Sequence, residues 1–197
     1  MKRLLPLMLC LPLFVACGPI LGQMMKASEG LKSFEVVDGN LSDLPEGKNL
    51  LVLGPFSITD EAFYIARGED AANFSRGFKN SALFQTTLYI ERQFDKVGDL
   101  EAKLRTSTPQ QIKEMLDLKS PPDLILFGTI LHRSTIVAPA RGVVMDVGYR
   151  LEFIDLGTGS ATIVEISVKE LFEQCVPRVV SEVTRRTREG HRLRQAG

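Results

Sequence analysis

The chain has 197 residues, and its 24 Lys and Arg side chains are balanced by 24 Asp and Glu side chains, so its formal net charge is zero. This balance excludes the strongly basic composition typical of nucleic-acid-binding domains, and we expect no nucleic-acid partner. Hydrophobic residues make up 44% of the chain, which at this length predicts one globular domain with a substantial core.

The first 16 residues have the pattern of a bacterial secretory signal peptide. Lys2 and Arg3 precede residues 4–16, an uncharged stretch that is too short to span a bilayer as a stable anchor. Cys17 follows Ala16 directly, which resembles the lipobox of bacterial lipoproteins, where the leader is removed and the cysteine is acylated. The alternative is an ordinary signal peptide followed by an incidental cysteine.

Lipidation of Cys17 would decide where the protein resides. Two or three acyl chains, such as palmitate, hold a protein on a membrane almost permanently, because each buried methylene adds about 0.8 kcal/mol. Gly18 follows the cysteine, and by resemblance to sorted lipoproteins this favours the periplasmic face of the outer membrane. Cys10 leaves with the leader, so Cys175 has no disulfide partner within the chain and is expected to be buried.

Residues 17–46 are predicted to be the lipidated cysteine and a linker, because Gly, Pro, Ser and Asn repeatedly interrupt any regular pattern. A short strand at residues 34–37 is the one element expected there. The predicted domain spans residues 47–185. Residues 186–197 form a basic C-terminal tail, whose end we expect to fray.

Two continuous apolar runs, residues 50–53 and 124–127, predict neighbouring central strands that are covered on both faces. Between them we expect a helix over residues 70–89. A strand over residues 86–90 is the alternative for its second part. A short strand is then predicted at residues 93–97.

The remaining elements complete a mixed sheet. A helix over residues 107–120 is expected to begin at its Thr-Pro pair. Apolar and polar residues alternate over 145–153 and 161–168, on either side of the turn sequence DLGTG, which predicts an antiparallel hairpin. The last segment is predicted to be helical from Lys169, with Pro177 as either a kink or the true start. We therefore expect an α/β fold, a mixed sheet with flanking helices.

The segments NLLVLGPF, QFDKV, PDLILFGTI and YRLEFIDLGTGSATIVEISV resemble the periplasmic α/β domain of envelope lipoproteins, a group that includes CsgG, LpoB and the N-terminal domain of TolB. The residues that match its structural motifs are Asp123, Gly128, Asp155, Thr158 and Gly159. The resemblance implies a non-enzymatic lipoprotein that binds or assembles with an envelope complex for secretion, flagella or cell-wall synthesis. The alternative that it implies is a subunit of an oligomeric, CsgG-like export channel, and hence a homo-oligomer.

The sequence predicts no catalytic residues, metal site or cofactor. His132 and His191 are the two histidines of the chain, and a single cysteine in the mature domain does not complete a Cys/His zinc set. Ser57, Ser134 and Ser160 have no His–Asp pair nearby in sequence, although such partners can meet in space.

Three segments are candidates for partner binding. Phe63 and Tyr64 lie in a charged stretch, where packing under a loop is an equally good interpretation. Arg133 and Arg141 flank the apolar residues 136–139 in a connector between strands. The basic tail begins with three arginines that could contact anionic lipid, glycan or an acidic partner, or could simply be a solvated helix end; they are Arg185, Arg186 and Arg188.

Overall fold

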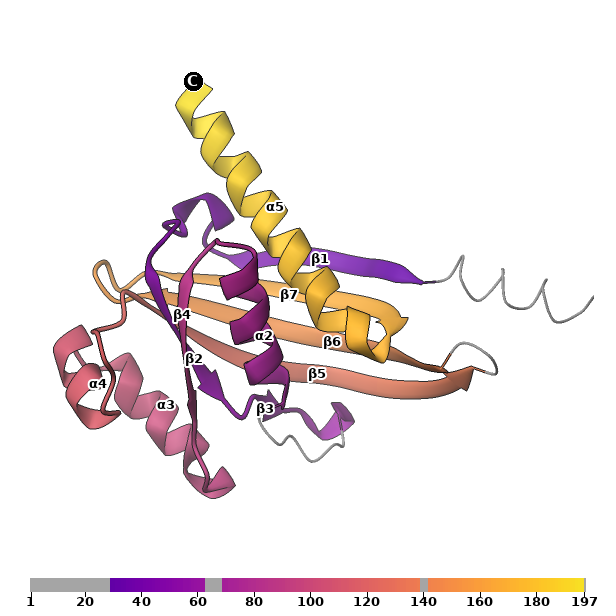
Figure 1. Cartoon of the computed structure of the whole chain (residues 1–197), viewed down its shortest axis with the longest axis horizontal. Coiled ribbons are helices and arrows are strands. Elements are labelled where there is room, and N and C mark those ends of the chain that lie inside the picture. The colour runs from indigo at the N-terminus through magenta and orange to yellow at the C-terminus, as the bar shows by residue number, and fades with distance from the viewer. Residues whose placement is uncertain (1–28, 63–68, 139–141, 197) are drawn as a thin grey trace, which may run out of the picture. The chain divides into compact units, whose positions relative to one another are not determined.

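The computed structural model describes residues 29–62, 69–138 and 142–196. Seven strands form one mixed sheet in the order β1-β7-β6-β5-β2-β4, and the short β3 pairs on β5 (Figure 1). The predicted α/β fold with flanking helices is therefore confirmed. The strands are β1 (Gly30–Asp38), β2 (Asn49–Gly54), β3 (Ser57–Ile58), β4 (Gln85–Ile90), β5 (Leu124–Ala138), β6 (Gly142–Asp155) and β7 (Ala161–Leu171).

The two apolar runs form the centre of the sheet. β2 and β5 are parallel neighbours, with Leu50 opposite Leu124 and Val52 opposite Leu126. All four side chains have 0% exposure. The sequence prediction of adjacent central strands is confirmed, because continuous apolar residues allow helices to cover both faces.

Helices cover each face of this central part (Figure 1). α2 (Glu69–Asn80) and α5 (Cys175–Ala196) share one core cluster with Leu50 and Val52. On the opposite face, α3 (Val97–Arg105) and α4 (Pro109–Met115) share a second cluster with the intervening residues of β2. Successive side chains of a strand point to opposite faces, so one apolar run supplies both clusters.

The segment between the central strands differs in part from the prediction. α2 ends at Asn80 and β4 follows, so a helix continuing through residue 89 is wrong and the alternative strand is correct. Ala82 has φ 54°, a left-handed conformation that terminates the helix. Residues 93–97 do not form the predicted strand, because η3 (Phe94–Lys96) leads directly into α3. The Thr-Pro start of α4 is confirmed as a capping box between Thr108 and Gln111.

The motif residues of the predicted resemblance have structural roles. A carboxylate oxygen of Asp123 accepts the backbone N–H of Asn49 at 2.9 Å, which ties β2 to the start of β5. Gly128 lies directly under the ring of Phe56, where a Cβ would collide. Asp155 accepts the N–H groups of residues 157 and 158 in the turn of the confirmed β6–β7 hairpin.

Both ends of the predicted domain need correction. Residues 30–46 are part of the fold, because β1 joins the sheet beside β7 and η1 (Leu41–Asp43) packs on α5. Leu41 and Leu44 are 4% and 3% exposed, so the linker prediction is wrong for these residues. Residues 17–28 of that linker lie outside the part described. The helix predicted from Lys169 also begins too early, because β7 continues to Leu171, η4 (Phe172–Gln174) follows, and α5 starts at Cys175 with Pro177 in its first turn rather than at a kink.

The predicted fraying tail is also wrong. α5 continues to Ala196, and Arg194 donates a hydrogen bond of 3.2 Å to the carbonyl of Ser42 and pairs with Asp43. Gly190 lies close to the Cβ of Ser42, so a larger residue there would collide with η1. The basic tail therefore packs against residues that sequence reasoning had placed in a linker.

Candidate functional site

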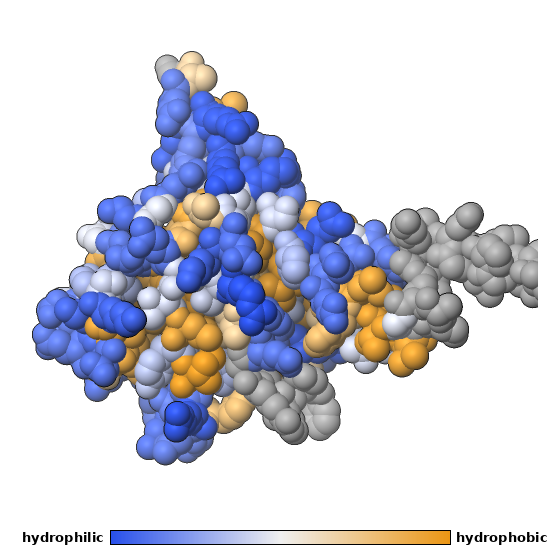
Figure 2. Space-filling model, in the orientation of Figure 1, coloured by the Kyte–Doolittle hydropathy of each residue, from blue (hydrophilic) through white to orange (hydrophobic). Residues whose placement is uncertain are grey.

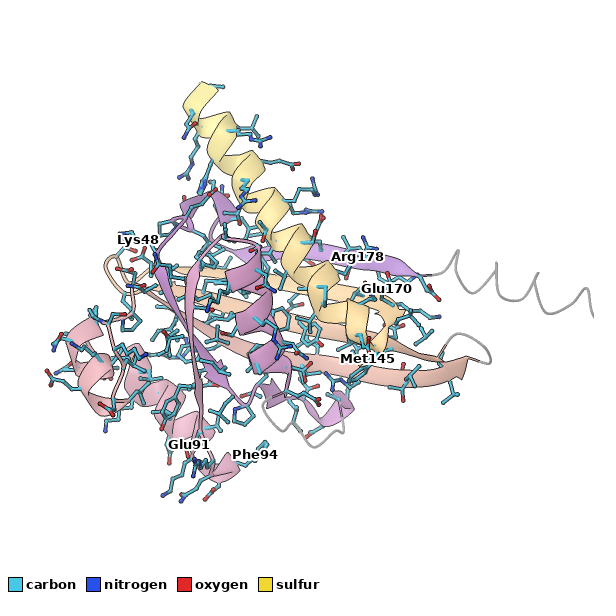
Figure 3. All side chains as sticks on the ribbon, in the orientation of Figure 1. Lys48, Glu91, Phe94, Met145, Glu170 and Arg178 are labelled. Carbon is cyan, nitrogen blue, oxygen red and sulfur yellow. The ribbon has the colours of Figure 1, made fainter. Side chains whose placement is uncertain are left out.

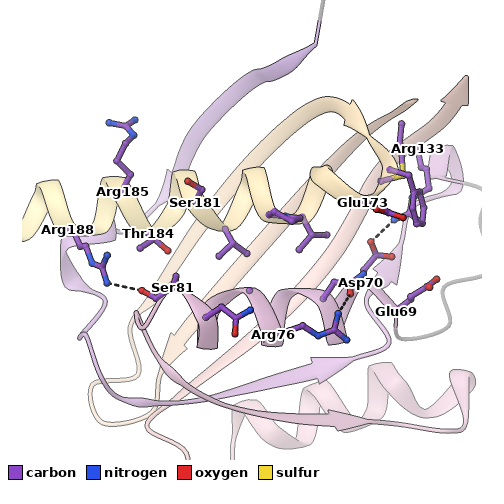
Figure 4. A pocket seen from close by; sticks show the side chains of 18 of the residues that line it. Glu69, Asp70, Arg76, Ser81, Arg133, Glu173, Ser181, Thr184, Arg185 and Arg188 are labelled. Carbon is purple, nitrogen blue, oxygen red and sulfur yellow. Dashed lines mark hydrogen bonds and ion pairs between the residues drawn. The ribbon is translucent and has the colours of Figure 1, made fainter. Parts of the chain in front are cut away.

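A groove of about 940 Å³ runs between α2 and α5 (Figure 4). Its apolar floor includes Val176 and Val180 of α5, and Gly77 allows the two helices to approach. A Cβ on Gly77 would lie 2.9 Å from a methyl group of Val180. The walls carry charges of both signs, with Glu69, Arg76, Glu173, Arg185, Glu189 and Arg192 among the lining residues.

A buried polar cluster closes one end of the groove. Arg133 of β5 donates a 2.7 Å hydrogen bond to Oδ1 of Asp70 (Figure 4). The hydroxyl of Tyr149 donates a second hydrogen bond to the same oxygen at 2.8 Å. The side chains of Arg133 and Asp70 are 6% and 12% exposed. A buried charge is tolerated when it is paired and hydrogen-bonded, and this cluster meets both conditions.

The cluster keeps Tyr149 in its neutral form. Burial, followed by the neighbouring Asp70 carboxylate, raises the pKa of Tyr149 well above its ordinary value. The hydroxyl therefore stays a donor over the whole physiological range. Phe74 packs edge-on against the tyrosine ring at 5.1 Å, which fixes the ring beneath α2. This end of the groove is a rigid wall.

The opposite end of the groove is held by Arg188, which donates a 2.9 Å hydrogen bond to the carbonyl of Ser81 just after α2 (Figure 4). Beside it, Thr184 lines the groove and is 6% exposed. Its hydroxyl has no hydrogen-bond partner within the described ranges. A buried hydroxyl without a partner is unusual in a native protein, and this oxygen is almost inaccessible from the groove.

The structure separates the three arginines that the sequence grouped together. Arg185 and Arg188 face the groove, whereas the guanidinium of Arg186 stacks over the ring of Phe34 in β1 at 3.9 Å. Glu182 accepts hydrogen bonds from Arg185 at 2.6 Å and Arg186 at 2.7 Å. These hydrogen bonds, that from Arg185 first, lower the pKa of Glu182 to about 2.

Four predicted site residues are not placed. Cys17, Phe63, Tyr64 and Arg141 all lie outside the residues that the structure describes. Arg133 is placed, but it serves the buried cluster with Asp70 and Tyr149 instead of the exposed partner contact that the sequence suggested. The sequence identified Arg133 by its place in a predicted connector, but this residue lies within β5, and its partners lie 63 and 16 positions away.

A serine, a histidine and an aspartate do meet on the sheet, but not as a catalytic triad. Ser167 and Asp146 lie 3.2 and 3.4 Å from the same atom, Nε2 of His132. A triad needs the carboxylate on one ring nitrogen and the nucleophile on the other. Gly148 stands opposite both His132 and Ser167, and its missing side chain makes room for the ring. Sequence reasoning missed Ser167, because the bulge between Ile130 and His132 shifts the alternation.

Met145 of β6 and Glu170 of β7 are paired with each other and are labelled in Figure 3. Cys175, at the start of α5, lies beside both residues. Its thiol donates toward their carbonyls at 3.7 and 3.6 Å. Burial raises the pKa of the thiol to about 11, so the predicted buried cysteine is confirmed. Across the described part of the chain, no group of three His, Cys, Asp or Glu side chains could hold a metal ion. Nor is any helix there long and apolar enough to cross a membrane.

No protein-family model matches the chain, and no curated protein matches it. Among solved structures, it is similar to a PelC variant dodecamer from Paraburkholderia phytofirmans (TM-score 0.46, 11% identity, covering 81% of this chain and 96% of that one). It is also similar to the PelC dodecamer of the same organism (TM-score 0.44, 11% identity, 81% and 96% coverage). A third similar structure is the hypothetical protein CT253 from Chlamydia trachomatis (TM-score 0.36, 13% identity, 75% and 95% coverage).

Proposed function

We propose that this protein is a non-enzymatic lipoprotein that is anchored through Cys17 at the periplasmic face of the outer membrane and binds a protein component of an envelope machine. The location rests on the leader and on Cys17 in the sequence. The binding role rests on the groove between α2 and α5. The machine would serve secretion, flagella or cell-wall synthesis, as the resemblance to envelope lipoproteins implies.

The groove is the observation that supports binding. It joins an apolar floor to walls that carry both arginine and glutamate. A uniformly charged polymer would meet like charges along such walls. A protein segment that carries apolar side chains flanked by both charges would match the groove, because interfaces combine an apolar centre with a polar rim.

The second candidate is a subunit of an oligomeric export channel, which the outer strand β4 favours. β4 is the last strand of the sheet order, and its six residues, QTTLYI, contain no charge and no proline. Leu88 and Ile90 are each 37% exposed. Charged residues, proline and bulges are the usual protections of an edge strand, and their absence from β4 leaves its free edge open to a second copy.

The anchor is tested by changing Cys17 to Ser. Incorporation of a fatty-acid analogue should be lost, and the protein should leave the membrane fraction. A Cys175→Ser variant is the matched control and should keep its label, because Cys175 is buried in the domain. Unchanged membrane association of the Cys17→Ser protein would contradict the lipid anchor.

The groove is tested by photo-crosslinking in the native envelope from three positions. A crosslinker at Ser181, which lines the groove, should capture one envelope protein. The same group at Glu114 on α4, on the opposite face of the sheet, should not. Capture of a second copy from Thr87 in β4, with none from Ser181, would favour the channel subunit. Equal capture from Ser181 and Glu114 would contradict the groove as a binding site.

A further inference from the structure

The end of the β5–β6 hairpin is an exposed apolar surface. Val137 is 78% exposed, and Ile136 and Val143 are 44% and 41% exposed. Phe172 of η4, at 40% exposure, lines the same hollow as Val143. Figure 2 shows apolar surface at this end of β5 and β6. We call these four residues the hairpin tip.

The hairpin tip extends beyond the rest of the sheet. The pairing of β6 with β7 ends at Val144 and Leu171. The pairing of β2 with β5 ends much earlier along β5, at Val52 and Leu126. Val137 and Val143 are paired with each other alone. Because neighbouring residues of a strand face opposite sides, Ile136 is exposed on one face and Val137 on the other. A protein partner would cover one face, whereas an apolar medium would cover both.

The chain enters the sheet at this same end (Figure 1). Gly39, directly after β1, lies against the backbone of Ala161 and Thr162 at the start of β7. The first residues of β1 therefore lie beside the last residues of β7, next to the base of the hairpin. The 13 peptide steps from Cys17 to Gly30 can extend at most about 45 Å, so a lipid on Cys17 would hold this end of the domain close to the bilayer.

We propose that the hairpin tip inserts into the headgroup–acyl boundary of the bilayer that holds Cys17. The inference rests on the proposed lipid anchor. Shallow insertion needs exposed aliphatic or aromatic side chains with few carboxylates nearby, since anionic lipids repel carboxylates. Residues 135–145 contain no Asp or Glu and one basic residue, Arg141, whereas Glu173 lies beside Phe172 at the edge of the hairpin tip. The anchor brings the tip to the lipid, and the tip then orients the groove relative to the membrane.

A polarity-sensitive fluorophore attached at Val137→Cys tests the contact. Cys175 is buried and does not compete for labelling. In the acylated protein on vesicles of phosphatidylethanolamine and phosphatidylglycerol, we expect blue-shifted and several-fold brighter emission than without vesicles. The matched control carries the fluorophore at Thr158→Cys, in the turn at the other end of β6, and its emission should stay water-like.

A second arm separates this inference from the anchor itself. The chain from Gly18 onward is held on vesicles that contain a nickel-chelating lipid through a histidine tag in place of the acylated cysteine. The shift at Val137 should appear here too, even if Cys17 proves not to be acylated. Emission that stays water-like in both arms would overturn the inference. So would an equal shift without vesicles in a protein that runs as a dimer, because the tip would then contact a second copy.

Discussion

The hydroxyl of Tyr149 in β6 donates a 2.8 Å hydrogen bond to Asp70 in α2, 79 positions earlier in the chain. The same oxygen of Asp70 accepts from Arg133 of β5 at 2.7 Å. One buried carboxylate therefore ties a helix to two strands of the sheet and closes the groove at that end. These hydrogen bonds join groups that are almost inaccessible to water. If the bonds were lost, water could not replace them at the same groups.

Removing this carboxylate should be costly. Asp70→Ala removes the carboxylate that accepts from both Arg133 and Tyr149, and we expect a loss of about 3–5 kcal/mol in the free energy of unfolding. Tyr149→Phe removes the hydrogen bond to Asp70 and the longer one from Arg133, and it should cost about 1–2 kcal/mol. Urea denaturation measures both. Glu69→Ala, at the adjacent exposed position, is the control and should stay within about 0.5 kcal/mol of the wild type.

Shortening a leucine in the central sheet should destabilise the fold, because the removed atoms leave a cavity. Leu126 has 0% exposure, so we expect Leu126→Ala to lower the free energy of unfolding by about 2–5 kcal/mol. Leu193→Ala makes the same chemical change at 76% exposure and should cost less than about 0.5 kcal/mol. Equal losses in the two variants would be incompatible with the central position of β5.

Deleting residues 187–197 should lower the melting temperature by many degrees. The deletion removes Thr187, which has 0% exposure, and the bonds from Arg188 to Ser81 and from Arg194 to Ser42. It therefore loosens both η1 and the end of α2. Deleting only residues 195–197 is the control, because Gln195 and Ala196 are exposed. Thermal denaturation followed by circular dichroism compares the two, and identical melting would mean that the helix end is not packed.

Stability should fall in acid partly through Glu182. Its pKa is lowered to about 2 in the folded protein by the hydrogen bonds from Arg185 and Arg186. A carboxyl group with a lowered folded pKa stabilises the fold above its ordinary pKa of 4.5 and loses that contribution as the pH falls toward 2. Glu182→Gln should therefore show a smaller loss of stability between these pH values in urea titrations. An unchanged slope would mean that the pairing does not persist in solution.

Cys175 should resist alkylation in the folded protein. The thiolate is the reactive form, and burial raises the pKa of this thiol to about 11. We expect iodoacetamide to modify it at neutral pH only after denaturant unfolds the domain, as mass spectrometry would show. The Val137→Cys variant supplies an exposed thiol in the same chain and should react rapidly. Fast labelling of Cys175 would require that the start of α5 opens readily.

The regular elements were predictable where the local pattern was strong. The continuous runs that became β2 and β5, the alternation of β6 and β7, and the Thr-Pro start of α4 each express a rule that acts over a few residues. The prediction failed at residues 82–97, where an Ala in a left-handed conformation and a short 3-10 turn interrupt the pattern. Neither feature has a strong sequence signal.

The two ends of the chain show what the sequence alone did not reveal. η1 and the end of α5 are rich in polar residues. Considered separately, their sequences predict a linker and a solvated tail. They are ordered because Leu41 and Leu44 are buried and because Arg194 reaches Ser42, 152 positions away. Such contacts stabilise the two segments together, because neither segment by itself makes the contacts that offset its loss of conformational entropy.

The sequence by itself determined the α/β class and the central strands, and it alone is the basis of the proposed leader before Cys17. Only the tertiary structure decided that Arg133 is buried against Asp70, that Arg186 stacks on Phe34 instead of lining the groove, and that α2 and α5 enclose this groove. Secondary structure follows from the periodicity of neighbouring side chains, which the sequence displays directly. A site is assembled from residues tens of positions apart, and their meeting depends on strand order and helix packing, which no local pattern encodes.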